Sequence, residues 1–208
     1  MKRFLAIFFV ISFFSFSNGV IFAQNRPDAL SEYRNGNWKS AAEVCRAEIK
    51  ENTQNLEAHI VLCWSLLKLG LYSETETYAL AAQKLNRYDV RVIEILGEVY
   101  YYLGQNYKAL QYFQEYINLA PEGQRIDVVF YLEGEIYIRL SRFKHADIAL
   151  STALHYIPDN ARWWARLGYA RENAGEPREA LIAYEKALAL DAGLTDAKRG
   201  LDRVRNAL

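Results

Sequence analysis

Cysteine and proline are scarce in this chain, which has 2 Cys and 4 Pro among 208 residues. So few cysteines exclude a small domain that is held together by a disulfide framework. The low proline content, with a hydrophobic fraction of 51%, excludes a disordered chain. An excess of basic charge is also missing, because 25 Lys+Arg face 25 Asp+Glu. We therefore expect no nucleic-acid partner, since such proteins carry a strongly cationic surface.

Recognisable catalytic and metal-binding motifs are missing as well. The histidines His59, His145 and His155 do not stand at metal-ligand spacing with another His, Cys or carboxylate on one helix face. The sequence has no phosphate-binding glycine loop and no Gly-x-Ser-x-Gly motif. We therefore expect a protein that is not an enzyme and that needs neither a cofactor nor a metal.

Long apolar runs are confined to the N-terminus. Lys2 and Arg3 precede an apolar run, and small residues follow it up to Ala23. This order predicts a secretory signal peptide over residues 1–23 that is cleaved after Ala23. The apolar part also has about the length of a bilayer span, so an uncleaved N-terminal anchor stays open as the alternative. We expect an exported, periplasmic protein whose mature chain, residues 24–208, has no membrane span.

The rest of the chain follows a period close to 34 residues. One column of residues, where a helix must stop and reverse, recurs at intervals of 34, 34, 37 and 34 residues: Gly36, Gly70, Gly104, Ser141 and Gly175. Three more columns keep the same phase: Ala41, Thr75, Ala109, Ala146 and Ala180; Cys63, Gly97, Gly134 and Gly168; Ala79, Phe113, Leu150 and Tyr184. Such a repeat predicts helix pairs that bury their apolar faces by stacking on neighbouring pairs. Within a pair, we expect Gly168 to lie where the second helix brings Ala180 close.

These columns resemble the tetratricopeptide repeat (TPR) pattern. The best unit reads Trp164-x-x-Leu167-Gly168, followed by Gly175, Ala180-x-x-x-Tyr184 and Ala187. The resemblance implies an all-α solenoid of stacked antiparallel helix pairs with a right-handed superhelical twist. We expect a degenerate unit at about 25–55, full units at 56–89, 90–123, 127–160 and 161–194, and a capping helix at 195–208. Arg199 and Arg203 fit the polar outer face of such a cap.

Two features depart from the pattern. Residues 124–126 are inserted between the third and fourth units, where we expect the superhelix to bend. Glu133 stands in a column that the other units fill with leucine: Leu62, Leu96 and Leu167. The carboxylate lies either at the open edge of the array or in an ion pair. A lone buried charge is costly, so we favour a pair with a nearby Arg or Lys.

The two cysteines fall in packing columns of neighbouring predicted helices, so we expect both to face a shared interior. One interpretation is two buried thiols that act as small apolar groups. The other is a disulfide between Cys45 and Cys63, which an exported location would permit. A disulfide requires their Cα atoms to lie within about 7 Å of each other.

The resemblance also implies that the first helix of each pair lines a concave surface on which partners commonly bind. Positions outside the packing columns supply its expected residues: Trp64, Leu67, Lys68, Arg91, Glu94, Glu98, Tyr101, Tyr102, Tyr131, Glu135, Ile138, Arg139, Arg162 and Tyr169. This set is rich in Tyr, Trp and Arg, the residues that are most enriched at binding hot spots. We therefore expect an aromatic groove that binds a protein or an extended peptide.

Two functions stay open. The first is an exported scaffold or adaptor, within a bacterial envelope assembly, that binds a protein or peptide. The alternative is an accessory protein of a solute transporter that holds a small apolar ligand; a closed cavity would favour this alternative. TPR modules that clamp the C-terminal carboxylates of chaperones use Lys and Asn on the concave face. Here that face has Glu94 and Glu98, so we do not expect that role.

Overall fold

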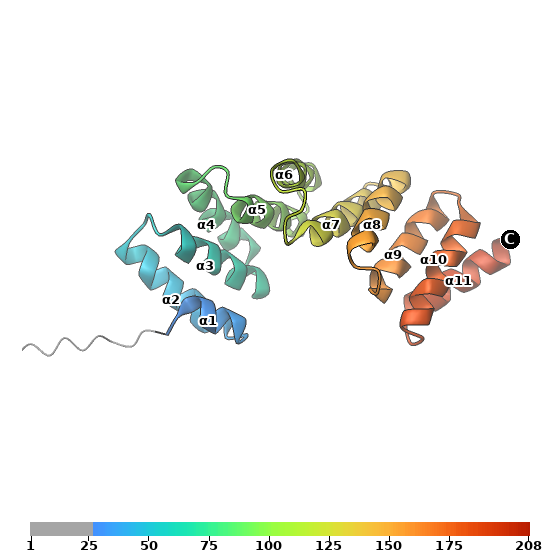
Figure 1. The fold of residues 1–208 in the computed structure, drawn as a ribbon, viewed down its shortest axis with the longest axis horizontal. Coiled ribbons are helices and arrows are strands. Elements are labelled where there is room, and N and C mark those ends of the chain that lie inside the picture. The colour runs from blue at the N-terminus through green and yellow to red at the C-terminus, as the bar shows by residue number, and fades with distance from the viewer. Residues whose placement is uncertain (1–26) are drawn as a thin grey trace, which may run out of the picture.

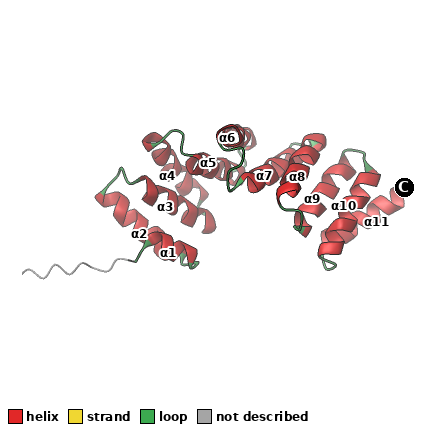
Figure 2. Cartoon of the chain, in the orientation of Figure 1, coloured by secondary structure: helices red, strands yellow, loops and turns green. Residues whose placement is uncertain are grey.

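The computed structural model describes residues 27–208, and within them the chain forms helices and no strand (Figure 2). The helices are α1 (Ala29–Arg34), α2 (Trp38–Glu51), α3 (Leu56–Lys68), α4 (Tyr72–Leu85), α5 (Val90–Tyr102), α6 (Asn106–Leu119), α7 (Ile126–Arg139), α8 (Phe143–Tyr156), α9 (Ala161–Asn173), α10 (Pro177–Leu190) and α11 (Thr195–Ala207). The predicted all-α fold is therefore confirmed. The signal-peptide prediction concerns residues 1–23, which lie outside the described part.

The helices stack side by side into an elongated array that begins at α1 and ends at α11 (Figure 1). Each helix packs on its successor, and the first helices of the pairs, α1, α3, α5, α7 and α9, also contact one another in series. They form a continuous surface, which we call the first-helix face. Among the described helices, none combines the length and the apolar character that crossing a membrane requires.

The reversal between the two helices of a pair uses a left-handed residue. Gly36, Gly70, Gly104 and Gly175 all have φ between 72° and 81°. Ser141, the fifth member of this column, has φ 55°, a conformation that non-glycine residues adopt at an energetic cost. The chain therefore keeps the turn geometry at Ser141 although it has lost the glycine.

Close packing within a pair depends on glycines in the first helix. A Cβ added at Gly97 would lie 2.4 Å from the Phe113 ring, and one added at Gly168 would lie 2.7 Å from the Tyr184 ring. The prediction named Ala180 as the residue that comes close to Gly168; the atoms nearest to an added Cβ belong to the Tyr184 ring. Each glycine makes room for the bulky residue of the following helix.

Both cysteines are fully buried and are free thiols in this structure. Burial raises the pKa of Cys45 to about 12. Burial also raises the pKa of Cys63, and the nearby Cys45 adds to the effect. The Cys63 thiol lies 3.9 Å from the backbone oxygen of Thr75 and donates to it. The two side chains thus occupy adjoining parts of the core as small apolar groups.

The carboxyl group of Glu133 is buried, with 8% of the residue exposed. Among residues 27–208, no ion pair or hydrogen bond reaches it, so the predicted pair with Arg or Lys is wrong. Burial raises its pKa to about 7. The array therefore contains one carboxyl group that is desolvated without a compensating charge.

Candidate binding face

The first-helix face carries two separate pockets. The N-terminal pocket has a volume of about 470 Å³ and is lined by Tyr33, Trp64, Leu67, Lys68, Val90, Arg91, Glu94, Glu98, Tyr102, Tyr116, Gly123, Gln124 and Arg125. The C-terminal pocket has a volume of about 460 Å³ and is lined by Tyr131, Arg162, Ala165, Arg166, Tyr169, Tyr184, Leu194, Asp196, Arg199 and Arg203. Both volumes lie in the range of ordinary ligand sites.

The predicted groove residues divide between these pockets. Seven of them line the N-terminal pocket: Trp64, Leu67, Lys68, Arg91, Glu94, Glu98 and Tyr102. Tyr131, Arg162 and Tyr169 line the C-terminal pocket. Four line neither pocket: Tyr101, Glu135, Ile138 and Arg139. The structure therefore does not bring the predicted set together in a single pocket.

The middle of the face is occupied by contacts within the chain. The Arg139 guanidinium lies 3.9 Å from the centroid of the Tyr101 ring, and its Nη1 donates to the Tyr101 backbone oxygen at 2.9 Å. Glu135 accepts two hydrogen bonds from Arg166, at 2.6 and 2.9 Å. These side chains already have partners, so they are less available to another protein than the sequence pattern suggested.

Three aromatic rings from three helices form the walls of the N-terminal pocket. Tyr33 of α1 and Trp64 of α3 lie 5.8 Å apart between ring centroids. Tyr102 of α5 is 46% exposed and stacks on Tyr72 of α4 at 4.6 Å. The Tyr72–Tyr102 stack holds an exposed ring in place, and Trp64 remains half-buried. The walls therefore offer preorganised aromatic surface to a partner.

The floor of this pocket is a buried charge cluster. Glu94 and Glu98 lie one turn apart on α5, and 4% and 8% of these residues are exposed. Arg125, which precedes α7, donates from Nε to Glu94 Oε1 at 3.0 Å and from Nη2 to Glu98 Oε1. The sequence pattern predicted both carboxylates as accessible groove residues, whereas the structure buries them beneath Arg125.

The ionisation of Glu94 depends on its charged neighbours. Burial raises the pKa of Glu94 to about 8, repulsion by the Glu98 charge adds to this, and Arg125 opposes it. Burial also raises the pKa of Tyr33, and the charges of Arg125, Glu98 and Glu94 act on its hydroxyl. Burial and the Glu98 charge therefore favour the protonated form of the Glu94 carboxyl group, while Arg125 favours its ionised form.

The inserted residues build this floor. The Arg125 backbone N–H donates to the Tyr116 hydroxyl at 3.2 Å. A Cβ added at Gly123 would lie 2.3 Å from the same hydroxyl oxygen, so only glycine allows the loop to approach Tyr116 this closely. Sequence reasoning missed Arg125 because its partner Glu94 lies 31 residues away. The available signal was the insertion itself, which places an arginine where the repeat has no equivalent residue.

The C-terminal pocket is rich in arginine. Arg166 is bound to Glu135, and Arg203 donates to Glu172 Oε1 at 2.7 Å. Arg162 and Arg199 are exposed and have no ion pair within the described residues. The prediction that assigned Arg199 and Arg203 to the outer face of the cap is wrong, because both line this pocket.

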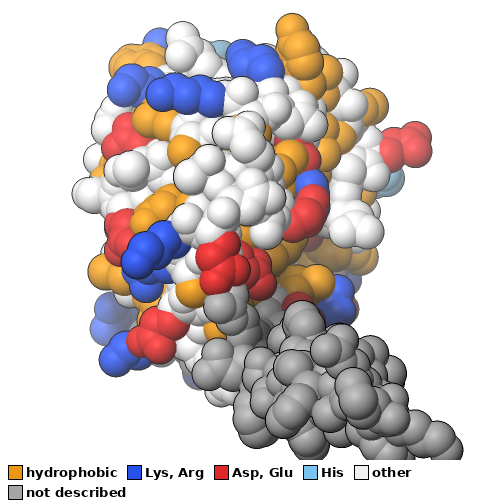
Figure 3. Space-filling model, turned by 90° about the vertical axis from the view of Figure 1, so that its left-hand side faces the viewer, with side chains coloured by type: hydrophobic (Ala, Val, Ile, Leu, Met, Phe, Trp, Pro, Cys, Tyr) orange, Lys and Arg blue, Asp and Glu red, His pale blue; other side chains and the backbone are white. Residues whose placement is uncertain are grey.

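The charged side chains on the molecular surface are mixed. Figure 3 looks onto the left-hand end of Figure 1, and there acidic and basic groups are interspersed with apolar patches. Over residues 27–208, no group of three or more His, Cys, Asp or Glu side chains could hold a metal ion. The two pockets are therefore the features of this chain that best fit a binding role.

The third and later repeat units match known family models. Residues 90–122 and residues 131–195 each match a model described as tetratricopeptide repeat. The chain is 28% identical over 150 residues to the DnaJ homolog subfamily C member 7 homolog of Schizosaccharomyces pombe, covering 63% of this chain and 32% of that protein. It is 31% identical over 110 residues to the Hsp70-Hsp90 organizing protein of Triticum aestivum, covering 50% and 18%. The chain thus spans less than a third of the length of these relatives.

Several solved structures share the fold. The MamA protein superposes with a TM-score of 0.67 at 20% identity, covering 79% of this chain and 88% of MamA. YrrB, described as a TPR protein with an unusual peptide-binding site, gives 0.69 at 20% identity, covering 80% and 84%. The Cut9–Hcn1 structure gives 0.73 at 19% identity, covering 85% and 34%. At these identities the similarity supports the stacked helix pairs of the fold.

Proposed function

We propose that this chain, in which residues 90–122 and 131–195 match tetratricopeptide repeat models, is a non-catalytic scaffold that binds an extended segment of a partner protein in the N-terminal pocket. One observation carries this proposal: rings from α1, α3 and α5 surround an open pocket above a buried ion cluster. Amphipathic rings bury a large area at a small cost in side-chain entropy, and such central anchors dominate many interfaces.

The shape of the pocket favours a peptide over an enclosed small molecule. Lys68, Tyr102 and Arg125 line the N-terminal pocket and are exposed. In the C-terminal pocket, Arg162 and Arg199 are exposed in the same way. A closed cavity would favour a small apolar ligand held for a transporter, whereas both pockets have exposed lining residues.

An acidic chaperone tail is not the partner that we propose. Two relatives have names that refer to DnaJ and to Hsp70-Hsp90, but the chain spans only part of each. The proposal rests on the aromatic walls of the N-terminal pocket, because its two carboxylates are buried and its lining also has Lys68, Arg91 and Arg125.

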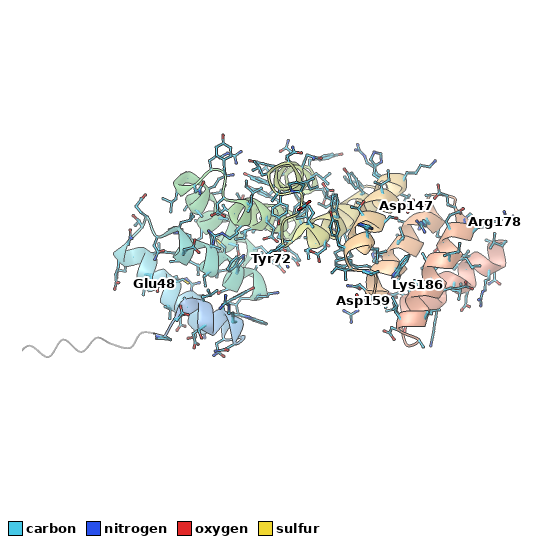
Figure 4. All side chains as sticks on the ribbon, in the orientation of Figure 1. Glu48, Tyr72, Asp147, Asp159, Arg178 and Lys186 are labelled. Atoms are coloured by element: carbon cyan, nitrogen blue, oxygen red, sulfur yellow. The ribbon has the colours of Figure 1, made fainter. Side chains whose placement is uncertain are left out.

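The partner can be isolated by pull-down from the native cells and then measured by calorimetry. We expect Trp64→Ala and Tyr102→Ala each to weaken binding by about tenfold or more, as truncation of central anchors does. The matched control is Lys186→Ala, since Lys186 is exposed on α10, away from the N-terminal pocket (Figure 4). If Lys186→Ala weakens binding and the two aromatic variants do not, the N-terminal pocket is not the site.

We also propose that the protein is exported and acts in a bacterial envelope assembly. The support is the sequence of residues 1–23, with its basic tip, apolar run and small-residue exit at Ala23. N-terminal sequencing of the protein from fractionated cells tests this proposal. A mature N-terminus at Gln24 in the periplasmic fraction supports it, and an intact N-terminus in the cytoplasmic fraction contradicts it.

A further inference from the structure

The polar groups that the N-terminal pocket offers to a partner are mainly hydrogen-bond donors. Its lining includes two carboxyl groups, Glu94 and Glu98, and both are buried and bound by Arg125. Lys68 and Arg125 are exposed in the same lining, and an ammonium or guanidinium group can only donate. A partner therefore meets exposed donors here, while the acceptors below them are already in use.

The indole of Trp64 adds a donor that has no partner. Within residues 27–208 its Nε1–H makes no hydrogen bond, whereas Nε1 of Trp164 donates to the Pro158 backbone oxygen at 2.8 Å. Trp64 is half-buried and lines the pocket. An indole N–H that becomes buried usually finds an acceptor, so a carbonyl oxygen of the partner is the group that fits this position.

This excess of donors suits a segment that is rich in proline. An extended peptide has one carbonyl and one N–H per ordinary residue, and each N–H that enters a pocket needs an acceptor there. Proline keeps the carbonyl, has no N–H and presents an apolar ring to aromatic walls. A polyproline II segment is also preformed, so less conformational entropy is lost when it binds.

The placement of the rings along the array matches the pitch of such a segment. Trp64 is on α3 and Tyr102 is on α5, and these two first helices contact each other. Packed helices lie about 8–10 Å apart, and one turn of polyproline II, which is three residues, advances about 9 Å. Prolines three residues apart would therefore reach rings on successive first helices. Tyr33, at 5.8 Å from Trp64 between ring centroids, enlarges the apolar surface at the first of these positions.

We propose that the N-terminal pocket binds a proline-rich segment of the partner in the polyproline II conformation. Two prolines, three residues apart, lie on the rings of Trp64 and Tyr102, and a carbonyl oxygen of the segment accepts from the Trp64 indole N–H. This inference rests on the proposed function, because it names the chemistry of the segment that binds in the same pocket. Arg125 stays on Glu94 and Glu98 in the bound form, since no charge of the partner has to replace it.

Three synthetic peptides test the proposal on the intact protein by NMR titration. The first is a capped peptide with the sequence Pro-Ala-Ala-Pro between alanine flanks. The second has alanine in place of both prolines, and we expect it to bind about tenfold more weakly or worse, because it adds two N–H groups where free acceptors are few. The third has the composition of the first but adjacent prolines, and it should also bind more weakly, because its prolines cannot reach both rings. If the first peptide binds no better than the other two, or does not bind at all, the proposal is overturned.

The indole N–H signals provide a readout at a single position. The Trp64 signal should shift when the first peptide binds, and the Trp164 signal should not, because that indole already donates to Pro158. Trp64→Phe keeps a ring but removes the donor, and it should weaken the first peptide by about threefold or more. Trp38→Phe is the matched control, since Trp38 lies outside the lining of this pocket. Melting curves check that both variants fold. A Trp64 signal that stays in place while the first peptide binds contradicts the proposed contact.

An acidic and a basic peptide of the same length test whether charge is recognised instead. If either binds more tightly than the first peptide, the pocket selects for charge and the proposal is overturned. If the native partner is weakened by Trp64→Ala and Tyr102→Ala but the peptides show no preference for proline, the proline inference is wrong and the proposed function stands. If the native partner is insensitive to both rings, the proposed function fails and this inference fails with it.

Discussion

Glu133 shows how one side chain departs from the repeat and what the departure costs. The other units place Leu62, Leu96 and Leu167 in this column, and each is at most 1% exposed. Glu133 is also buried in α7, although 8% of the residue is exposed, and burial is the cause of its raised pKa. In the unfolded chain the carboxyl group titrates near 4.5, so the folded form holds its proton more tightly. The destabilisation caused by Glu133 is therefore absent at low pH and grows as the pH rises from about 4.5 to about 7.

Replacement of this carboxyl by leucine should stabilise the array in a pH-dependent way. The pKa change from 4.5 to about 7 corresponds to about 3 kcal/mol of destabilisation at pH 8. We expect Glu133→Leu to recover about this free energy at pH 8 and much less at pH 4.5, measured by urea unfolding. Glu135→Leu is the control, because it removes the partner of Arg166 and should lower stability instead. A Glu133→Leu effect that is the same at both pH values would contradict the interpretation.

Ser141 shows a cost in the backbone instead of the side chain. It has φ 55° in a column of residues that are otherwise glycine. We expect Ser141→Gly to raise the free energy of unfolding by about 0.5–1 kcal/mol, because a Cβ is unfavourable in the left-handed region. The reverse change, Gly104→Ser, should lower it by a similar amount. A Cβ at Gly104 meets nothing within 4 Å, so the control measures the backbone alone. A destabilised Ser141→Gly variant in a chemical melt would count against this account.

Within each helix pair, a small residue on one helix faces a larger residue on the other. A Cβ added at Gly134 would lie 2.6 Å from the Leu150 side chain, and one added at Gly168 would lie 2.7 Å from the Tyr184 ring. In the α3–α4 pair the sizes are exchanged, because Cys63 stands in the glycine column and Ala79 in the bulky one, and both are fully buried. The pair tolerates a side chain in α3 because the residue in α4 is small.

A larger residue at Gly168 should therefore be among the most damaging single changes. We expect Gly168→Leu to cost at least about 1–3 kcal/mol, since the Tyr184 ring cannot move away without disturbing its hydrogen bond to Glu172. Thermal melting measures the loss. The milder change Gly168→Cys should cost much less in a Tyr184→Ala background, which imitates the α3–α4 pair. If the two changes add without interaction, the two side chains do not share the space that the structure gives them.

The array as a whole could be predicted from the sequence because its information is periodic. The glycine and bulky columns indicate the helix pairs and even the position of Ser141, since each unit repeats the same local contacts. The groove could be predicted only in part. Trp64 and Tyr102 follow the repeat and were found, whereas Arg125 comes from an insertion and reaches Glu94 across 31 residues. Contacts made by inserted residues do not recur with the repeat, so the periodic pattern does not reveal them. The burial of Glu94 and the division of the first-helix face into two pockets were therefore missed.

Because each unit contacts only its neighbours, damage at one end should stay local. In α11, Leu201 and Val204 are buried, and Gly200 lies against the Tyr184 ring of α10. A chain that ends at Gly193 should therefore lose hydrogen-exchange protection in α9 and α10 while α3 to α6 keep theirs.

The same truncation separates the two pockets. It removes Arg199 and Arg203 from the C-terminal pocket but no residue that lines the N-terminal one. We expect the native partner to bind this shortened chain with unchanged affinity in calorimetry, because its anchors lie on α1, α3 and α5. Arg205→Ala is the matched control, since Arg205 is exposed and pairs with Glu185 without entering the core. Loss of protection throughout the array would show that the stack unfolds as one unit. Loss of partner affinity without such unfolding would move the binding site to the C-terminal pocket.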